Sequence, residues 1–100
     1  MNIPPFGMRA ILIIFLLAAC REAADTAVPR LTKQLEAKES SERNAAALKL
    51  ASYGPEGKSA VPALVRRLTD GNSGVRSSAA YALRAIGTPE AVAALDSYKK

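Results

Sequence analysis

Histidine and tryptophan are absent from this chain of 100 residues, and cysteine occurs once. Zinc and iron sites are built largely from histidine and cysteine ligands, so we expect no metal centre and no other cofactor. A single cysteine cannot close an internal disulfide, so the fold must be held together by packing. Hydrophobic residues make up 49% of the chain and aromatic residues only 5%. Most of the hydrophobic residues are alanine and leucine, which favour helices, so the composition predicts an all-α protein.

An apolar run long enough to span a membrane is also missing. The uninterrupted apolar run at 10–19 has 10 residues, whereas a membrane-spanning helix needs roughly 17 to 25. Met1–Arg9 carries one basic side chain ahead of this run, and the run ends in small residues, which is the layout of a secretory signal peptide. We expect residues 1–19 to be a signal segment that is removed. The sequence leaves open whether translation starts at Met1 or at Met8.

Cys20 indicates which kind of signal this is. Together with Leu17, Ala18 and Ala19 before it, Cys20 resembles the lipobox of bacterial lipoproteins. The resemblance implies that Cys20 becomes the first residue of the mature protein and carries two or three acyl chains such as palmitate, enough for stable anchoring. It also implies a bacterial cell envelope, and Arg21, which is not the aspartate associated with inner-membrane retention, favours the outer membrane facing the periplasm. The alternative is that Cys20 is one more small apolar residue of a signal or of a buried helix.

The chain repeats itself with a period of 33 residues. Residues 27–54 align with residues 60–87 without a gap, and 11 of the 28 aligned positions are identical. A third copy covers residues 88–98 and contains one helix only. Because periods of this length are typical of stacked helical hairpins, we predict a short α-solenoid of about two and a half hairpins over residues 27–98. A short tether at 20–26 joins it to the signal segment.

Each copy can be divided into two helices. In the first helices, leucine and valine recur three or four residues apart and therefore lie on one face: Leu31, Leu35, Leu64, Val65 and Leu68. The second helices are expected at Ser41–Tyr53 and Gly74–Ile86, with Leu48 and Tyr81 at equivalent places. Their inward faces carry small residues that allow close helix approach: Ala46, Ala47, Leu50, Ala79, Ala80 and Leu83.

The residues at the helix ends can also be assigned from their side chains. Serine and threonine are good N-caps, glycine accepts the positive φ at a helix exit, and proline and glutamate suit a first turn. The expected N-caps are Ser40 or Ser41, Ser73 and Thr88; the helix exits are Gly54 and Gly87; the first-turn residues are Pro29, Pro62, Pro89 and Glu90. The alternative for the first helices is an earlier start, at Pro55 or Glu56 in the second copy, in which case the proline would kink the helix.

The second copy resembles a known repeat family. Val75–Gly87, preceded by Ala60–Leu64 and by Asp70, is similar to a HEAT repeat of the short, phycobilisome-lyase-like class. The resemblance covers residues 24–98 and is weaker in the first copy. It implies an α-solenoid, but not the lyase activity associated with the class, because nothing in the sequence implies a pigment-bearing partner.

In that family an aspartate and an arginine form a ladder between helix turns and neighbouring repeats, which makes Asp70, Arg76 and Arg43 structural candidates here. A ligand-binding role for these arginines is the alternative. A cation in the first turn opposes the helix dipole, so a carboxylate partner for each arginine is physically sensible. The first copy has Ala37 where the second has Asp70. The sequence therefore leaves Glu36, Glu39 or no residue as the partner of Arg43.

The sequence offers little for catalysis. A serine nucleophile needs a neighbouring base, and the lysine and acidic residues are spread over the expected solvated helix faces. Gly71–Gly74 lacks the lysine and the preceding strand of a phosphate-binding loop, and we expect it to be a turn. We predict that the protein is not an enzyme.

The chain is basic, with 14 lysine and arginine residues against 9 acidic ones and a formal net charge of +5. Stacking the copies aligns a basic stripe on the first helices, which is a candidate contact for an anion or a partner: Arg30, Lys33, Arg66 and Arg67. The alternative is that these side chains only solvate the surface. Nucleic acid is not expected, because an exported protein seldom meets it and no aromatic residues interleave with the charges.

The leading functional expectation is a lipid-anchored envelope protein that binds a protein partner on a small helical platform, as a scaffold or adaptor, since solenoid repeats commonly serve recognition. The alternative is an envelope accessory that binds anionic lipid or polysaccharide through its basic face. Because at least three repeats are usually needed for a stable stack, self-association is a further expectation. The sequence does not identify the partner.

Overall fold

The computed structural model describes residues 22–99, so the predicted signal segment and Cys20 lie outside the described residues. All regular elements of this part of the chain are helices, which confirms the all-α prediction. Its elements are α2 (Ala24–Gln34), α3 (Ser40–Tyr53), the 3₁₀ helix η1 (Gly54–Ala60), α4 (Val61–Arg67), α5 (Ser73–Ile86) and α6 (Pro89–Lys99).

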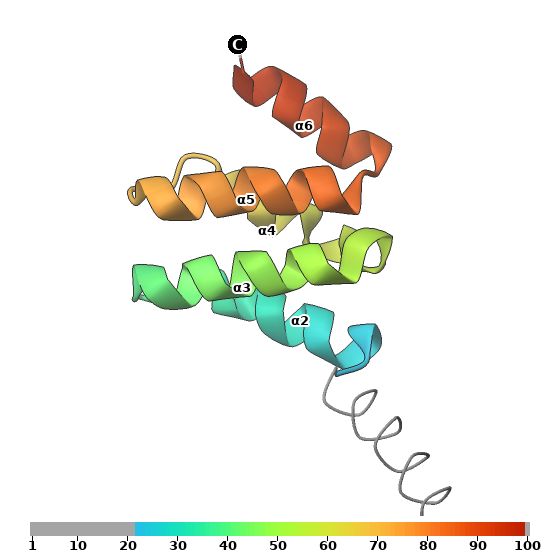
Figure 1. The fold of residues 1–100 in the computed structure, drawn as a ribbon. Helices are drawn as coiled ribbons and strands as arrows, with labels where there is room; N and C mark the ends of the chain where they lie inside the picture. Colours follow the sequence, from blue (N-terminus) through green and yellow to red (C-terminus); the bar gives the residue numbers. More distant parts are fainter. Residues whose placement is uncertain (1–21, 100) are drawn as a thin grey trace, which may run out of the picture.

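The helices form two layers. Figure 1 shows α3 and α5 side by side in one layer, with α2 and α4 behind them and α6 at the carboxy-terminal end. Each first helix packs against the second helix of its own copy, α2 against α3 and α4 against α5. Two hairpins followed by a single helix are therefore stacked in sequence order, and the predicted short α-solenoid is confirmed.

The core lies between the two layers and consists mainly of leucine and alanine. The largest fully buried side chains come from both copies: Leu31, Leu35, Leu50, Leu64, Leu83, Ile86 and Val75. The predicted leucine faces are thus buried. Ala47 is fully buried, whereas its equivalent Ala80 is only half-buried. The two alanines differ because α5 covers α3, and no second helix of a third copy covers α5 among the described residues.

The helix exits follow the prediction, but two N-caps do not. Gly54 and Gly87 have φ of 59° and 67°, and the Thr88 hydroxyl accepts a hydrogen bond from the Ala91 amide at 3.3 Å. The serine N-caps are wrong, because α3 begins at Ser40 and α5 at Ser73, which makes these serines the first helical residues. Asn72 caps α5 by accepting a hydrogen bond from the Val75 amide at 3.1 Å, and Glu39 precedes α3 without a side-chain cap.

The two prolines of the first helices occupy different positions. Pro62 lies in the first turn of α4, as expected, after the 3₁₀ helix η1. Pro29 lies inside α2, because that helix begins at Ala24, before the expected start of the first repeat. The last three residues of the predicted tether at 20–26 are therefore helical.

Candidate functional site

The carboxylate of Asp70, in the turn between α4 and α5, accepts four hydrogen bonds. The Asp70 side chain is 2% exposed. It accepts two hydrogen bonds from the guanidinium of Arg43, from Nε at 2.8 Å and from Nη2 at 2.9 Å. It also accepts hydrogen bonds from the backbone amide of Asn72 at 2.9 Å and from Nη1 of Arg67 at 3.0 Å. The carboxylate is therefore buried with its charge fully compensated.

Arg43 joins the two repeats. Besides the carboxylate of Asp70, its Nη1 donates to the carbonyl oxygens of Ala37 at 2.9 Å and of Lys38 at 2.8 Å, in the turn before α3. The expectation that Glu36, Glu39 or no residue would be its partner is wrong. The partner comes from the next copy, because the stacking of α3 on α5 brings the turn before α5 beside the start of α3.

These contacts set the ionisation of the buried pair. The hydrogen bonds from Arg43 lower the pKa of Asp70 below its ordinary value, and burial acts in the opposite direction. The Asn72 amide and the charge of Arg67 also favour the ionised carboxylate of Asp70 and so lower its pKa. The same pairing raises the pKa of Arg43. Both groups are thus charged in the folded protein at neutral pH.

The guanidinium of Arg76 makes one hydrogen bond, whereas that of its equivalent, Arg43, makes four. Nη1 of Arg76 donates to the backbone carbonyl of Asp70 at 2.7 Å, just as Nη1 of Arg43 donates to the carbonyl of Ala37 one repeat earlier. Among the described residues Arg76 has no carboxylate partner, contrary to expectation.

Most of the predicted basic stripe is engaged in ion pairs. Arg30 pairs with Glu22 at 2.5 Å and Arg66 pairs with Glu36 at 3.2 Å, all at the surface. The Arg30 guanidinium also lowers the pKa of Glu22 through its hydrogen bond. Arg67 turns inward to Asp70, with 20% of its side chain exposed.

Lys33 is the member of the stripe that has no such partner within residues 22–99. The stripe is therefore not a continuous surface of free cations.

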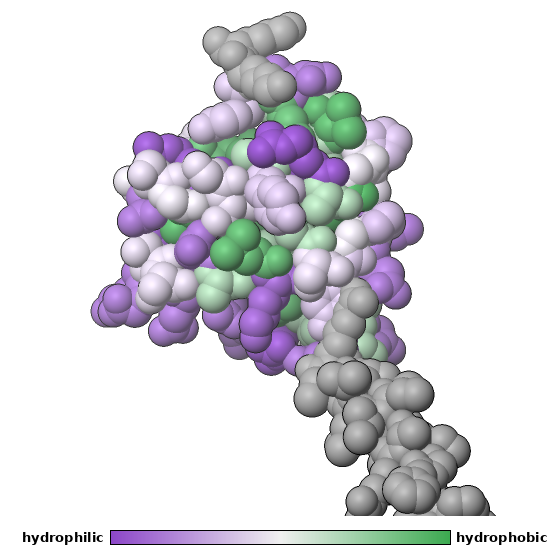
Figure 2. Space-filling model, viewed as in Figure 1, coloured by the Kyte–Doolittle hydropathy of each residue, from purple (hydrophilic) through white to green (hydrophobic). Residues whose placement is uncertain are grey.

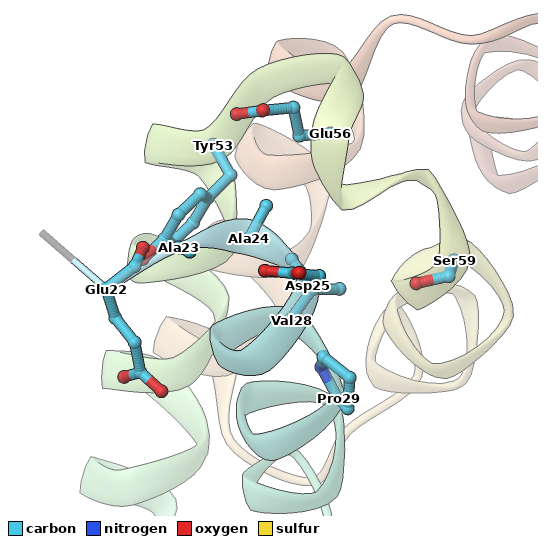
Figure 3. Close-up of a pocket in the computed structure, with 9 residues that line it drawn as sticks. All are labelled: Glu22, Ala23, Ala24, Asp25, Val28, Pro29, Tyr53, Glu56 and Ser59. Carbon is cyan, nitrogen blue, oxygen red and sulfur yellow. The ribbon is translucent and has the colours of Figure 1, made fainter.

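A cleft of about 650 Å³ opens at the amino-terminal end of the stack. Figure 3 shows the residues that line it, which come from the start of α2, the end of α3 and η1. The hydroxyl of Tyr53 donates to the carbonyl of Glu22 at 2.5 Å and holds the entry to α2 against α3. The acidic lining residues are Glu22, Asp25 and Glu56, and the described part of the chain contains no cluster of three metal-ligating side chains.

The second helices expose large hydrophobic side chains at equivalent positions of the two copies. Leu48 on α3 is 45% exposed and Tyr81 on α5 is 55% exposed. Figure 2 shows apolar side chains over α3 and over α6 on this face of the molecule. Val92 and Tyr98 of α6 are exposed to a similar degree. Within residues 22–99, no helix is both long and apolar enough to span a membrane.

Three side-chain contacts between the repeats were not anticipated from the sequence. Arg43 pairs with Asp70 and Arg66 pairs with Glu36. The hydroxyl of Ser78 on α5 donates a hydrogen bond to the side-chain oxygen of Asn44 on α3. The partners of each contact come from different copies. Aligning the two copies matches equivalent positions and does not show which residues of one copy touch the other. The available signal was that Asn44 and Ser78 are polar residues on predicted helix faces rich in alanine.

Stacked helical hairpins with a leucine and alanine core and polar links between repeats define the class of α-solenoid repeat proteins. The family model described as HEAT repeats matches residues 28–98, and the chain therefore belongs to the HEAT-repeat family. No curated protein and no solved structure gives a significant match.

Proposed function

We propose that this chain is a non-enzymatic scaffold that binds a protein partner in a bacterial cell envelope, on the surface formed by α3 and α5. The observation that carries the proposal is the exposure of Leu48 and Tyr81, 45% and 55%, at equivalent positions on neighbouring helices. Tyrosine is among the side chains that contribute most binding energy at protein interfaces. HEAT repeats generally act as platforms for protein interaction, which supports this use of the surface.

Polar links between the two helices of the platform also support the proposal. Arg43 and Asp70 link the start of α3 to the turn before α5, and Asn44 and Ser78 link the amino-terminal halves of the two helices. A surface whose helices are already linked needs less ordering on binding, and this lowers the entropic cost of association.

The proposed anchor is an acylated Cys20, in the outer membrane and facing the periplasm. α2 begins at Ala24, so three residues separate Cys20 from the helix. Three residues span at most about 11 Å, so an anchor at Cys20 would hold the first hairpin close to the bilayer. A side surface such as that of α3 and α5 would stay accessible in this arrangement.

Site-specific crosslinking in intact cells tests the platform. A photoreactive amino acid is placed at Leu48, at Tyr81 and, as a control on the other layer, at the exposed Lys33. We expect one protein, identified by mass spectrometry and confirmed with the purified partner, to be captured from Leu48 and Tyr81 but not from Lys33. Capture of lipid alone from both positions would overturn the proposal.

The anchor is tested separately by labelling cells with an alkyne analogue of palmitate. The wild-type chain is expected to incorporate the label, and the Cys20→Ser variant is expected to lose it. An unlabelled wild-type chain would overturn the anchor without affecting the proposed platform.

A further inference from the structure

Residues 22–99 leave one side of α5 uncovered, and the internal repeat identifies that side. Asn44, Ala47 and Ala51 lie on one side of α3, and this side faces α5, as the contact between Asn44 and Ser78 shows. Ala47 is fully buried and Ala51 is 8% exposed. Their equivalents one period later, Ser77, Ala80 and Arg84, lie on the side of α5 turned away from α3.

This side of α5 forms a shallow groove with α6. The groove has a volume of about 290 Å³ and is lined by Ser73, Arg76, Ser77, Ala80 and Arg84 of α5 and by Tyr98 of α6. Ser77 and Arg84 are exposed and Ala80 is half-buried. In the stack, α6 follows α5 as α4 follows α3. The uncovered side of α5, next to α6, therefore corresponds to the side of α3 that α5 covers one repeat earlier.

The groove carries two positive charges that no carboxylate neutralises within the described chain. Within residues 22–99 the guanidinium of Arg76 donates only to the carbonyl of Asp70, although that of its equivalent Arg43 binds a carboxylate at 2.8 Å and 2.9 Å. Arg84 stands where the first copy has Ala51, and no hydrogen bond or ion pair joins its side chain to another residue of 22–99. The groove thus combines a small apolar floor with two unneutralised guanidinium groups.

We infer that this groove binds one acidic helix of a partner protein, laid parallel to α5 as α5 lies on α3. In this arrangement a carboxylate in the turn before the partner helix binds Arg76, as Asp70 binds Arg43. Small side chains face Ala80, and a second carboxylate near the end of the partner helix meets Arg84. The inference rests on the proposed platform function and gives it a second contact surface and a class of ligand.

A second copy of this chain fits the groove less well. The first hairpin of a second copy has Ala37 at the position of Asp70, so it cannot supply the carboxylate for Arg76. That hairpin would also bring α2 into the place that α6 already occupies beside α5. A single helix with acidic residues avoids both conflicts.

A peptide copying residues 70–86 tests the inference, because this segment is the helix that occupies the equivalent place one repeat earlier. The peptide is stapled to keep it helical, since short helices are marginal in water, and it carries A85E. Asn44 of α3 contacts Ser78 of α5, so a residue of the covering helix lies beside the residue 34 positions before it. By this spacing, position 85 lies beside Ala51, whose equivalent on α5 is Arg84. When the peptide covers α5, its position 85 should therefore lie beside Arg84 of the protein. Fluorescence anisotropy measures its binding to the full chain in detergent micelles.

We expect the peptide to bind the wild-type chain, and Arg84→Gln to weaken binding about two- to fivefold, as for an exposed ion pair. A D70N peptide should bind more weakly to the wild-type chain, and Arg76→Gln in the protein should then cause little further loss. Arg30→Gln, at the other end of the stack, is the matched control and should leave binding unchanged.

Absence of peptide binding, or equal binding to the wild-type chain and Arg84→Gln, would overturn the groove as a helix-binding site. Self-association of the chain that Arg84→Gln abolishes would show that a second copy fills the groove and would overturn the partner helix. Neither result affects the crosslinking test at Leu48 and Tyr81. Failure of the groove as a binding site can therefore be distinguished from failure of the proposed platform function.

Discussion

Arg43 and Asp70 form a two-point ion pair across the boundary between the two complete repeats, with N to O distances of 2.8 Å and 2.9 Å. The guanidinium also binds the carbonyls of the turn before α3, so three segments meet at one buried charge pair. Removing one partner of a buried pair leaves the other charge uncompensated, which costs more than the pair itself contributes. The stack should therefore be most sensitive to mutation here.

The Asp70→Asn variant tests this sensitivity. The amide keeps the size of the carboxylate but leaves Arg43 and Arg67 without a counter-charge, so we expect the free energy of unfolding to fall by about 3 kcal/mol. Urea unfolding followed by far-ultraviolet circular dichroism measures the change. Asp96→Asn, which removes an exposed carboxylate of α6, is the control and should change stability by less than about 0.5 kcal/mol. Equal effects of the two substitutions would contradict the role of Asp70.

The pH dependence of stability provides an independent measure of the same pair. Hydrogen bonds from Arg43 lower the pKa of Asp70 in the folded state, while the pKa of an unfolded aspartate is about 3.9. The folded state therefore binds fewer protons at this site, and its stabilisation is fully present above about pH 4. It is lost as the pH falls through the lower folded-state pKa.

Melting temperatures measured between pH 7 and pH 2 should thus show a large difference between wild type and Asp70→Asn at neutral pH. The difference should shrink below about pH 4, where the wild-type carboxylate begins to take up its proton on unfolding. A difference that stays constant across this range would show that the ionised carboxylate is not the stabilising form.

The elements of the fold were predictable because they depend on local patterns. Leucines spaced three and four apart locate the buried faces, and Gly54 and Gly87 mark the helix exits that the structure shows. The pairing of Arg43 was not predictable in the same way. Its partner lies 27 residues away in another copy, so it depends on how α3 stacks on α5. The two serine N-caps were wrong for a smaller reason, because α3 and α5 each begin one residue before the expected position.

The helix exit at Gly87 gives a test of the backbone rather than of side-chain contacts. Its φ is 67°, and a Cβ built there would meet no atom closer than 3.6 Å, so the cost of Gly87→Ala comes from the left-handed conformation. We expect a loss of about 1 to 2 kcal/mol in the free energy of unfolding. Gly71→Ala is the matched control, because its φ is not positive and no atom lies within 4 Å of a Cβ there. A loss at Gly71 equal to that at Gly87 would contradict this account.

The basic stripe can now be tested without damaging the fold. Arg67 contacts the buried Asp70 at 3.0 Å and should be left in place, whereas Lys33 and Arg66 are exposed. If the protein platform is the function, the double variant Lys33→Gln/Arg66→Gln should bind purified envelope fractions as well as the wild type does at low and at high salt. Loss of this binding at low salt would favour the alternative in which anionic lipid or polysaccharide is the ligand, because surface charge attraction weakens as salt is added.

The exposed pair on the second helices gives the most direct test of partner binding. Leu48 and Tyr81 are about half exposed, so Leu48→Ser and Tyr81→Ser should each change the free energy of unfolding by about 0.5 kcal/mol or less. Their effect on affinity for the captured partner should be far larger, at least about tenfold for Tyr81→Ser if tyrosine is a hot spot. Val92→Ser on α6 removes a side chain of similar exposure, 46%, and should leave affinity unchanged. A uniform loss for all three variants would indicate nonspecific hydrophobic contact rather than a defined surface on α3 and α5.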